Sequence, residues 1–155
     1  MKEIKTEEIS RRAAELFLAG YNCAQAVYAA FAPIIGVDEK EALKIAAPFG
    51  GGFGRLRHVC GAFSGMNLVL GNLCGYDDLS SPEKDLLYPR VQELARRFET
   101  VQGSIICKDI LKNQAEIGGT ASPRTKEFYA KRPCAFVVEE GARILNEYLK
   151  EEKLL

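Results

Sequence analysis

Apolar residues recur at spacings of three and four along most of the chain, and little of it alternates apolar with polar residues. The first pattern is typical of amphipathic helices that face a common core, whereas alternation would indicate strands. Of the 155 residues, 47 % are hydrophobic, which is enough for one core without disulfide or metal staples. We therefore expect an all-α fold: one domain over residues 1–155, built as a multi-helix bundle.

Caps, glycines and prolines divide the chain into helical segments. The expected helices cover about residues 6–19, 23–35, 39–47, 62–74, 82–102, 105–111 and 133–150. Residues 62–74 are apolar on nearly every side, which predicts a buried central helix whose glycines, Gly65 and Gly71, permit close helix approach. Pro89 is expected to kink or divide the long helix. Residues 113–131 are polar and read as a long loop with one helical turn.

The segment GGGFG at residues 50–54 predicts a glycine-rich loop before the central helix. It is not a dinucleotide-binding fingerprint, because Arg57 stands where the last glycine belongs and no strand precedes it. A tight turn is its simplest explanation. The backbone amides of Gly51 and Gly52, together with Arg55, are candidates for binding an anionic ligand or cofactor.

Four of the five cysteines share one position: each lies at or just before the first turn of an expected helix, on or near its apolar stripe. They are Cys23, Cys60, Cys107 and Cys134. Backbone N–H groups and the helix dipole favour a thiolate there, and the thiolate is the form that attacks disulfides and binds metals. Core filling alone gives no reason for this repetition, so we predict one site formed by all four. Cys74, at the far end of the central helix, is interpreted as a core residue.

The sequence around these cysteines resembles a known family. The resemblance rests on four segments: GYNCAQAV around Cys23, CGAFSG from Cys60 with GGGFGR before it, GSIICKDIL around Cys107 and RPCAFVVEEGARIL around Cys134. Together they resemble the redox-active proteins named for the cysteine pattern C_GCAxxG_C_C, over nearly the whole chain from about residue 20 to 149. The resemblance implies a small, mainly helical protein with a redox role that rests on these four cysteines. The resemblance does not identify a substrate.

Thiol redox chemistry is the first hypothesis for the four cysteines. One thiolate would attack and another would resolve, which makes the protein a thiol-based oxidoreductase or an electron-transfer protein. Cys60 is the expected attacker, because Arg55, Arg57 and His58 are close in sequence and would favour its thiolate. The resolving cysteine is left open, and no Cys-x-x-Cys pair of the thioredoxin kind is present.

Two alternatives remain at this stage. Cys23, Cys60, Cys107 and Cys134 are also candidate ligands for an iron-sulfur cluster or a zinc ion, because both favour tetrahedral sulfur ligation. Such a protein would bind metal without thiol exchange. In the third hypothesis the chain is a helical interaction module whose cysteines are only packing.

Charge and hydropathy bear on partners and location. Lys plus Arg and Asp plus Glu both number 21, so the net charge is zero and no basic face for nucleic acid is indicated. We expect a small-molecule or protein redox partner. The first twenty residues lack the apolar core of a signal peptide, and no run approaches the roughly 18 apolar residues of a membrane span. The sequence therefore predicts a cytoplasmic protein with no membrane insertion.

Overall fold

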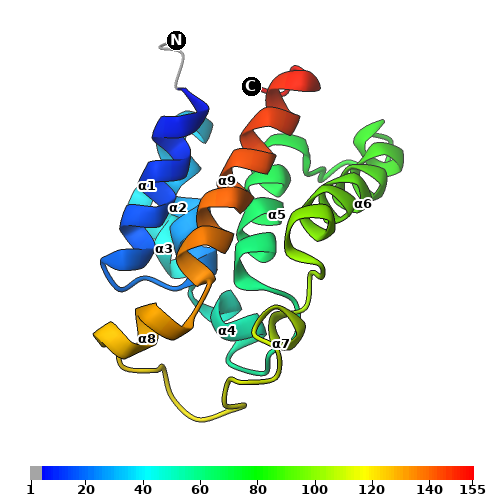
Figure 1. The fold of residues 1–155 in the computed structure, drawn as a ribbon. Helices are drawn as coiled ribbons and strands as arrows, with labels where there is room; N and C mark the ends of the chain where they lie inside the picture. The colour runs from blue at the N-terminus through cyan, green and yellow to red at the C-terminus, as the bar shows by residue number, and fades with distance from the viewer. Residues whose placement is uncertain (1–4) are drawn as a thin grey trace.

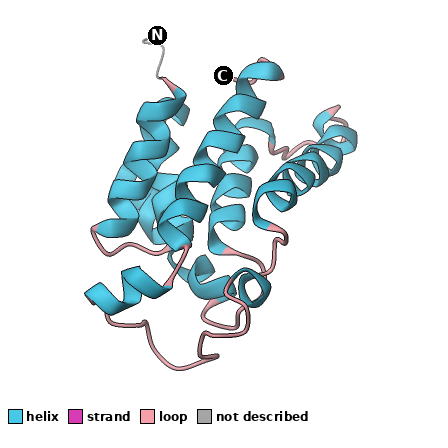
Figure 2. Ribbon diagram, viewed as in Figure 1, coloured by secondary structure: helices cyan, strands magenta, loops and turns pink. Residues whose placement is uncertain are grey.

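The computed structural model describes residues 5–155, and helices account for most of them (Figure 2). In chain order they are α1 (Thr6–Leu18), α2 (Cys23–Ile35), α3 (Glu39–Ala46), the 3₁₀ turn η1 (Ala47–Phe49), α4 (Gly50–Phe53), α5 (Gly61–Cys74), α6 (Glu83–Gln102), α7 (Cys107–Ile110), α8 (Lys126–Lys131) and α9 (Cys134–Glu151). The described residues contain no strand, only a single bridge between Val59 and Ile106. The all-α prediction is confirmed. None of the described helices is long and apolar enough to cross a membrane.

The long helices stand side by side, and the short helices α4, α7 and α8 gather at one end of the bundle (Figure 1). Helix α9 packs along α1, and α5 packs along α2. Helix α5 also contacts α6 and α9, and most of its side chains are buried, which confirms the predicted central helix. Helices α2, α5 and α9 all begin at the end that carries the short helices, whereas α1 begins and α9 ends at the opposite end.

Local capping explains where the first helices begin. The Asn22 side chain accepts a hydrogen bond from the Gln25 N–H at 2.9 Å, and the Gln25 side chain accepts one from the Asn22 N–H at 3.0 Å. This is the predicted capping box. Gly36 ends α2 in the left-handed conformation, with φ of 71°. Asp38 caps α3 by accepting from the Glu41 N–H at 3.1 Å. These boundaries follow from neighbouring residues, so the sequence predicts them well.

Two local predictions need correction. Helix α6 is continuous through Pro89, which lies near its N-terminal end and removes one backbone hydrogen bond without ending the helix. The glycine-rich segment, expected as a loop with a tight turn, is not confirmed as a loop. It forms α4, in which Gly51 and Gly52 have left-handed φ values of 66° and 69°. Their lack of a Cβ allows this tight, irregular turn. The expected loop before α9 is present, and α8 is its helical turn.

Gly65 brings α2 and α5 into close contact. A Cβ added there would lie 2.9 Å from both the Ala24 carbonyl oxygen and the Val27 Cβ, which is closer than real Cβ contacts. Gly71, six residues further along α5, has nothing within 4 Å of such an atom. The prediction of close approach is therefore confirmed for Gly65 and wrong for Gly71.

This difference gives a matched pair of substitutions. Gly65→Ala should lower the free energy of unfolding by about 1–3 kcal/mol, because the methyl group overlaps α2 backbone. Gly71→Ala should leave it unchanged or raise it by about 0.5–1 kcal/mol, because alanine is the better helix former. Urea unfolding of both variants measures the two effects. Equal destabilisation by both substitutions would contradict this account of the α2–α5 contact.

Candidate functional site

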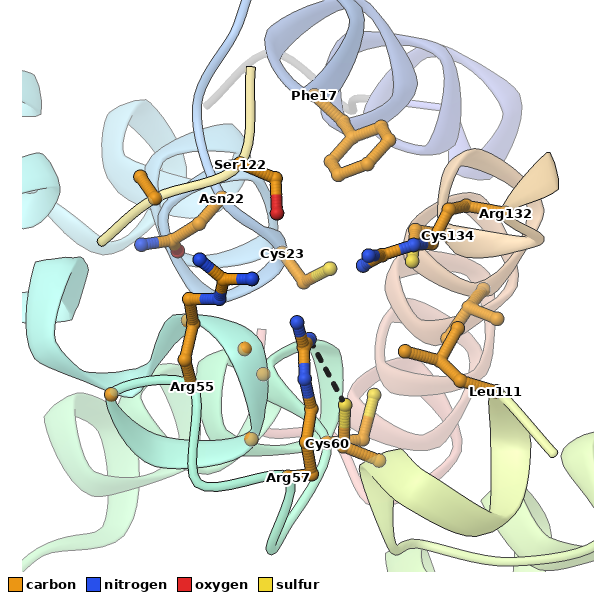
Figure 3. Close-up of a pocket in the computed structure, with 18 of the residues that line it drawn as sticks. Phe17, Asn22, Cys23, Arg55, Arg57, Cys60, Leu111, Ser122, Arg132 and Cys134 are labelled. Atoms are coloured by element: carbon orange, nitrogen blue, oxygen red, sulfur yellow. Dashed lines mark hydrogen bonds between the residues drawn. The ribbon is translucent and has the colours of Figure 1, made fainter. Parts of the chain in front are cut away.

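The four predicted cysteines converge at the end of the bundle where the short helices lie. Cys23 is the first residue of α2, Cys60 is the N-cap of α5, Cys107 is the first residue of α7 and Cys134 is the first residue of α9. All four line one cavity of about 290 Å³ (Figure 3). The predicted placement of these cysteines at helix N-termini is confirmed. Cys74 is buried elsewhere, where its sulfur accepts from Arg90 at 3.6 Å.

Helix α4 forms one wall of the cavity, and Gly52 allows it to lie against α7. A Cβ added at Gly52 would lie 2.6 Å from the Cys107 Cβ and 2.7 Å from the His58 backbone nitrogen. The turn is held by backbone bonds, with the His58 N–H donating to the Gly52 carbonyl at 2.8 Å and the Cys107 N–H to the His58 carbonyl at 2.6 Å. Gly51 and Arg55, the other residues predicted to bind an anion, also line the cavity. Their binding role stays a prediction.

The environment of Cys60 disfavours a thiolate. Burial raises the pKa of the Cys60 thiol to about 12, although the backbone N–H groups of Ala62 and Phe63 partly oppose this. The charges expected to activate it are engaged elsewhere: Arg57 contacts Cys107, and the His58 side chain is exposed outside the cavity. The expectation that Cys60 is the attacking thiolate is therefore not supported. The closeness of Arg57 and His58 to Cys60 in sequence did not bring their charged groups into contact with its sulfur.

Cys134 has the environment that the sequence assigned to Cys60. A hydrogen bond from the Cys23 side chain lowers the pKa of Cys134 to about 7, and the positive charges of Arg132, Arg124 and Arg57 act in the same direction against burial. The same hydrogen bond, together with burial, raises the pKa of Cys23 well above its ordinary value. Cys134 is therefore the more acidic of the two thiols and ionises before Cys23.

Arg57 links Cys107 to the cavity wall. Its side chain is only 3 % exposed, Nε donates to the Glu116 carbonyl at 2.8 Å, and Nη1 lies 3.8 Å from the Cys107 sulfur. Burial raises the pKa of Cys107, and Arg57 partly opposes that rise. Cys107 is thus less activated than Cys134, although it lies beside an arginine.

Two cavity arginines, Arg124 and Arg132, were missed from sequence: Arg124 falls in the segment expected to be a loop, and Arg132 directly follows that segment. Arg124 donates to the carbonyl oxygens of Phe17 at 2.9 Å and Tyr21 at 2.8 Å, and its guanidinium stacks 4.4 Å from the centroid of the Phe17 ring. It thereby fastens this segment to the end of α1. The one available signal was that Arg132 stands two residues before Cys134.

A four-thiolate metal site does not fit these side-chain positions. Within residues 5–155, no group of three or more His, Cys, Asp or Glu side chains is arranged to hold a metal ion. The four cysteines line a common cavity, but their side chains are not grouped as tetrahedral ligation of zinc or an iron-sulfur cluster requires. The geometry instead places two of the thiols, Cys23 and Cys134, close enough in one cavity for each to shift the pKa of the other.

The comparison with known protein families agrees with the cysteine pattern. The family described as "Putative redox-active protein (C_GCAxxG_C_C)" matches residues 21–148, a stretch that contains all four cavity cysteines. The chain belongs to this family. No curated protein and no solved structure matches the chain significantly. The C_GCAxxG_C_C assignment therefore gives a redox-active family, and the specific chemistry has to be argued from the cavity.

The difference between Cys134 and Cys60 can be measured by alkylation. Iodoacetamide reacts with thiolates, so the labelling rate of Cys134 should rise with pH through a midpoint near its pKa of about 7. Labelling of Cys60 should remain slow across neutral pH, because its pKa is about 12 and its side chain is buried. Peptide mass spectrometry of the native protein resolves the two sites. Faster labelling of Cys60 than of Cys134 at neutral pH would reverse the assignment.

Proposed function

We propose that this C_GCAxxG_C_C protein is a thiol-based oxidoreductase in which Cys134 is the attacking thiolate and Cys23 the resolving thiol. The observation that carries the proposal is that Cys23 and Cys134, from the first turns of α2 and α9, line one cavity and shift each other's pKa in opposite directions. Adjacent thiols of unequal acidity are what disulfide exchange requires, since one must attack while the other waits.

The proposed reaction passes two electrons from the protein to a disulfide substrate. The Cys134 thiolate attacks one substrate sulfur, the substrate S–S bond breaks, and the first product leaves as a thiolate that takes up a proton. Cys23 then loses its proton and attacks the Cys134 sulfur, which releases the second product thiolate. The protein is left with a Cys23–Cys134 disulfide, and a separate dithiol reductant restores the two thiols.

The interaction between the two thiols sets the order in which they ionise. The pKa of Cys23 is raised mainly by its hydrogen bond to Cys134, with burial and the charge of Cys134 adding to the effect. Once Cys134 is joined to the substrate, its sulfur carries no negative charge and this contribution disappears. Cys23 then ionises more easily, at the step where it must attack. Before that step it remains a thiol and does not compete with Cys134.

Cys60 and Cys107 have supporting roles in this proposal. Cys60 is the N-cap residue of α5, and the backbone N–H groups of Ala62 and Phe63 lower its pKa, although its side chain makes no capping hydrogen bond. Cys107 holds Arg57 in the cavity wall. We expect serine at either position to slow the reaction without abolishing it. Loss of Cys23 or Cys134 should abolish disulfide formation in the pair.

Oxidation of the reduced protein tests the pairing. One equivalent of diamide should produce a Cys23–Cys134 disulfide, detected as a linked peptide by mass spectrometry without reduction. Cys134→Ser and Cys23→Ser should both lose this peptide, and Cys74→Ser, the matched control outside the cavity, should keep it. A linked peptide that contains Cys60 in the wild-type protein would replace the proposed pair by another.

Metal analysis of protein purified without oxygen separates the proposal from metal binding. We expect the Cys23 and Cys134 thiols to be free and titratable. Stoichiometric iron with acid-labile sulfide, or stoichiometric zinc, lost in the Cys134→Ser variant but kept in Cys74→Ser, would overturn thiol exchange in favour of a metal site. Thiols that react only after denaturation would instead favour the interaction-module hypothesis.

A further inference from the structure

We infer that the cysteine cavity selects a small anionic substrate. This rests on the proposed function and adds the substrate class: a low-molecular-weight disulfide that carries a carboxylate or another anionic group. Four cavity arginines and the size of the cavity carry the inference.

The cavity concentrates positive charge in a protein that has no net charge. Every charged side chain among the described residues that line it is an arginine, namely Arg55, Arg57, Arg124 and Arg132. The whole chain balances 21 basic against 21 acidic residues, so the excess is local to this cavity. Low-dielectric walls strengthen such a field and draw in ligands of the opposite sign.

Protein carboxylates leave most of this charge uncompensated. Within residues 5–155, Arg55 is the only cavity arginine that forms an ion pair. Its partner is Glu116, at 3.5 Å. The Glu116 side chain is 91 % exposed, so the pair is weak and easily exchanged. Arg57 and Arg124 bond to backbone carbonyls, which satisfy their donors but do not neutralise their charge. The Cys134 thiolate balances only one positive charge.

Two arginines have donors available for a ligand. The Arg55 Nε is buried without a hydrogen-bond partner, a costly state that an anionic group would relieve. The Arg132 guanidinium lies 4.7 Å from the centroid of the Phe128 ring, which supports it without using its donors. Both side chains point toward the space around the Cys23 sulfur (Figure 3). An anion bound between them would lie next to the reacting pair.

The volume and walls of the cavity favour a small molecule over a protein disulfide. About 290 Å³ is at the lower end of the roughly 300–1,000 Å³ typical of small-ligand pockets. The segment before α8 forms one wall, and it is fastened by Arg124 and by the Gly118 N–H, which donates to the Arg55 carbonyl at 2.9 Å. A protein strand carrying a disulfide would have to displace this wall.

Three disulfides of similar size and different charge test the inference: dithiodiglycolate, an anion; bis(2-hydroxyethyl) disulfide, neutral; and cystamine, a cation. Each is mixed with pre-reduced protein, and the second-order rate constant for Cys23–Cys134 disulfide formation is measured in a single turnover. We expect dithiodiglycolate to exceed the neutral disulfide by about tenfold or more, as a charge-assisted hydrogen bond in a buried site allows. Cystamine should be the slowest.

Arg132→Gln isolates the contribution of one arginine. Removing its charge also makes Cys134 less acidic, but that effect applies equally to all three disulfides and cancels in the ratio of anionic to neutral rate constants. We expect this ratio to fall by about tenfold. Arg132→Lys should restore part of it, and Arg96→Gln, an exposed α6 control outside the cavity, should leave it unchanged.

The outcomes separate this inference from the proposed function. Equal rate constants for the three disulfides, or an unchanged ratio in Arg132→Gln, would overturn the anionic substrate and leave thiol exchange standing. If no disulfide is reduced, the proposed function fails. Calorimetry with thiodiglycolate, a thioether that cannot exchange, then tests whether the cavity binds an anion. Binding that weakens in Arg132→Gln would support an anion site without thiol exchange. Absence of binding would overturn both.

Discussion

The close contact between α2 and α5 is the constraint on which the rest of the site depends. At Gly65 the two helices approach so closely that a Cβ has no room, and at Gly61 an added Cβ would lie 3.1 Å from the Cys23 Cβ. The two helices therefore begin side by side, which brings Cys23 and Cys60 to one cavity. Helix α9, packed along α1 and against α2, adds Cys134 at the same end.

The convergence of helix N-termini concentrates positive charge at the cavity. Three helices of at least three turns, α2, α5 and α9, direct the positive ends of their dipoles toward the cavity, and four arginines add to this field. Such a concentration of positive charge is stable only beside a negative group. A thiolate on Cys134 supplies one such group, and an anionic ligand would supply another. The acidity of Cys134 and the selection of an anion thus have one physical cause.

Backbone strain lies where the cavity wall is built. Phe53, Arg55 and Arg57 adopt the left-handed conformation, with φ of 70°, 62° and 60°. This conformation costs roughly 1–2 kcal/mol for a residue with a Cβ, so the surrounding bonds must hold it. The result is that Arg55 and Arg57 both line the cavity although they lie only two positions apart.

The sequence by itself determined the helices and the position of each cysteine within its helix, because periodicity and capping depend on residues a few positions apart. It did not determine which thiol is activated. The charges near Cys60 in sequence do not offset the burial that raises its pKa, whereas Cys23 and Arg132, with Arg124 and the sequence-distant Arg57, lower the pKa of Cys134. Only the tertiary structure decided this, because burial and Coulomb interactions depend on distance in space, and packing of separate helices sets that distance.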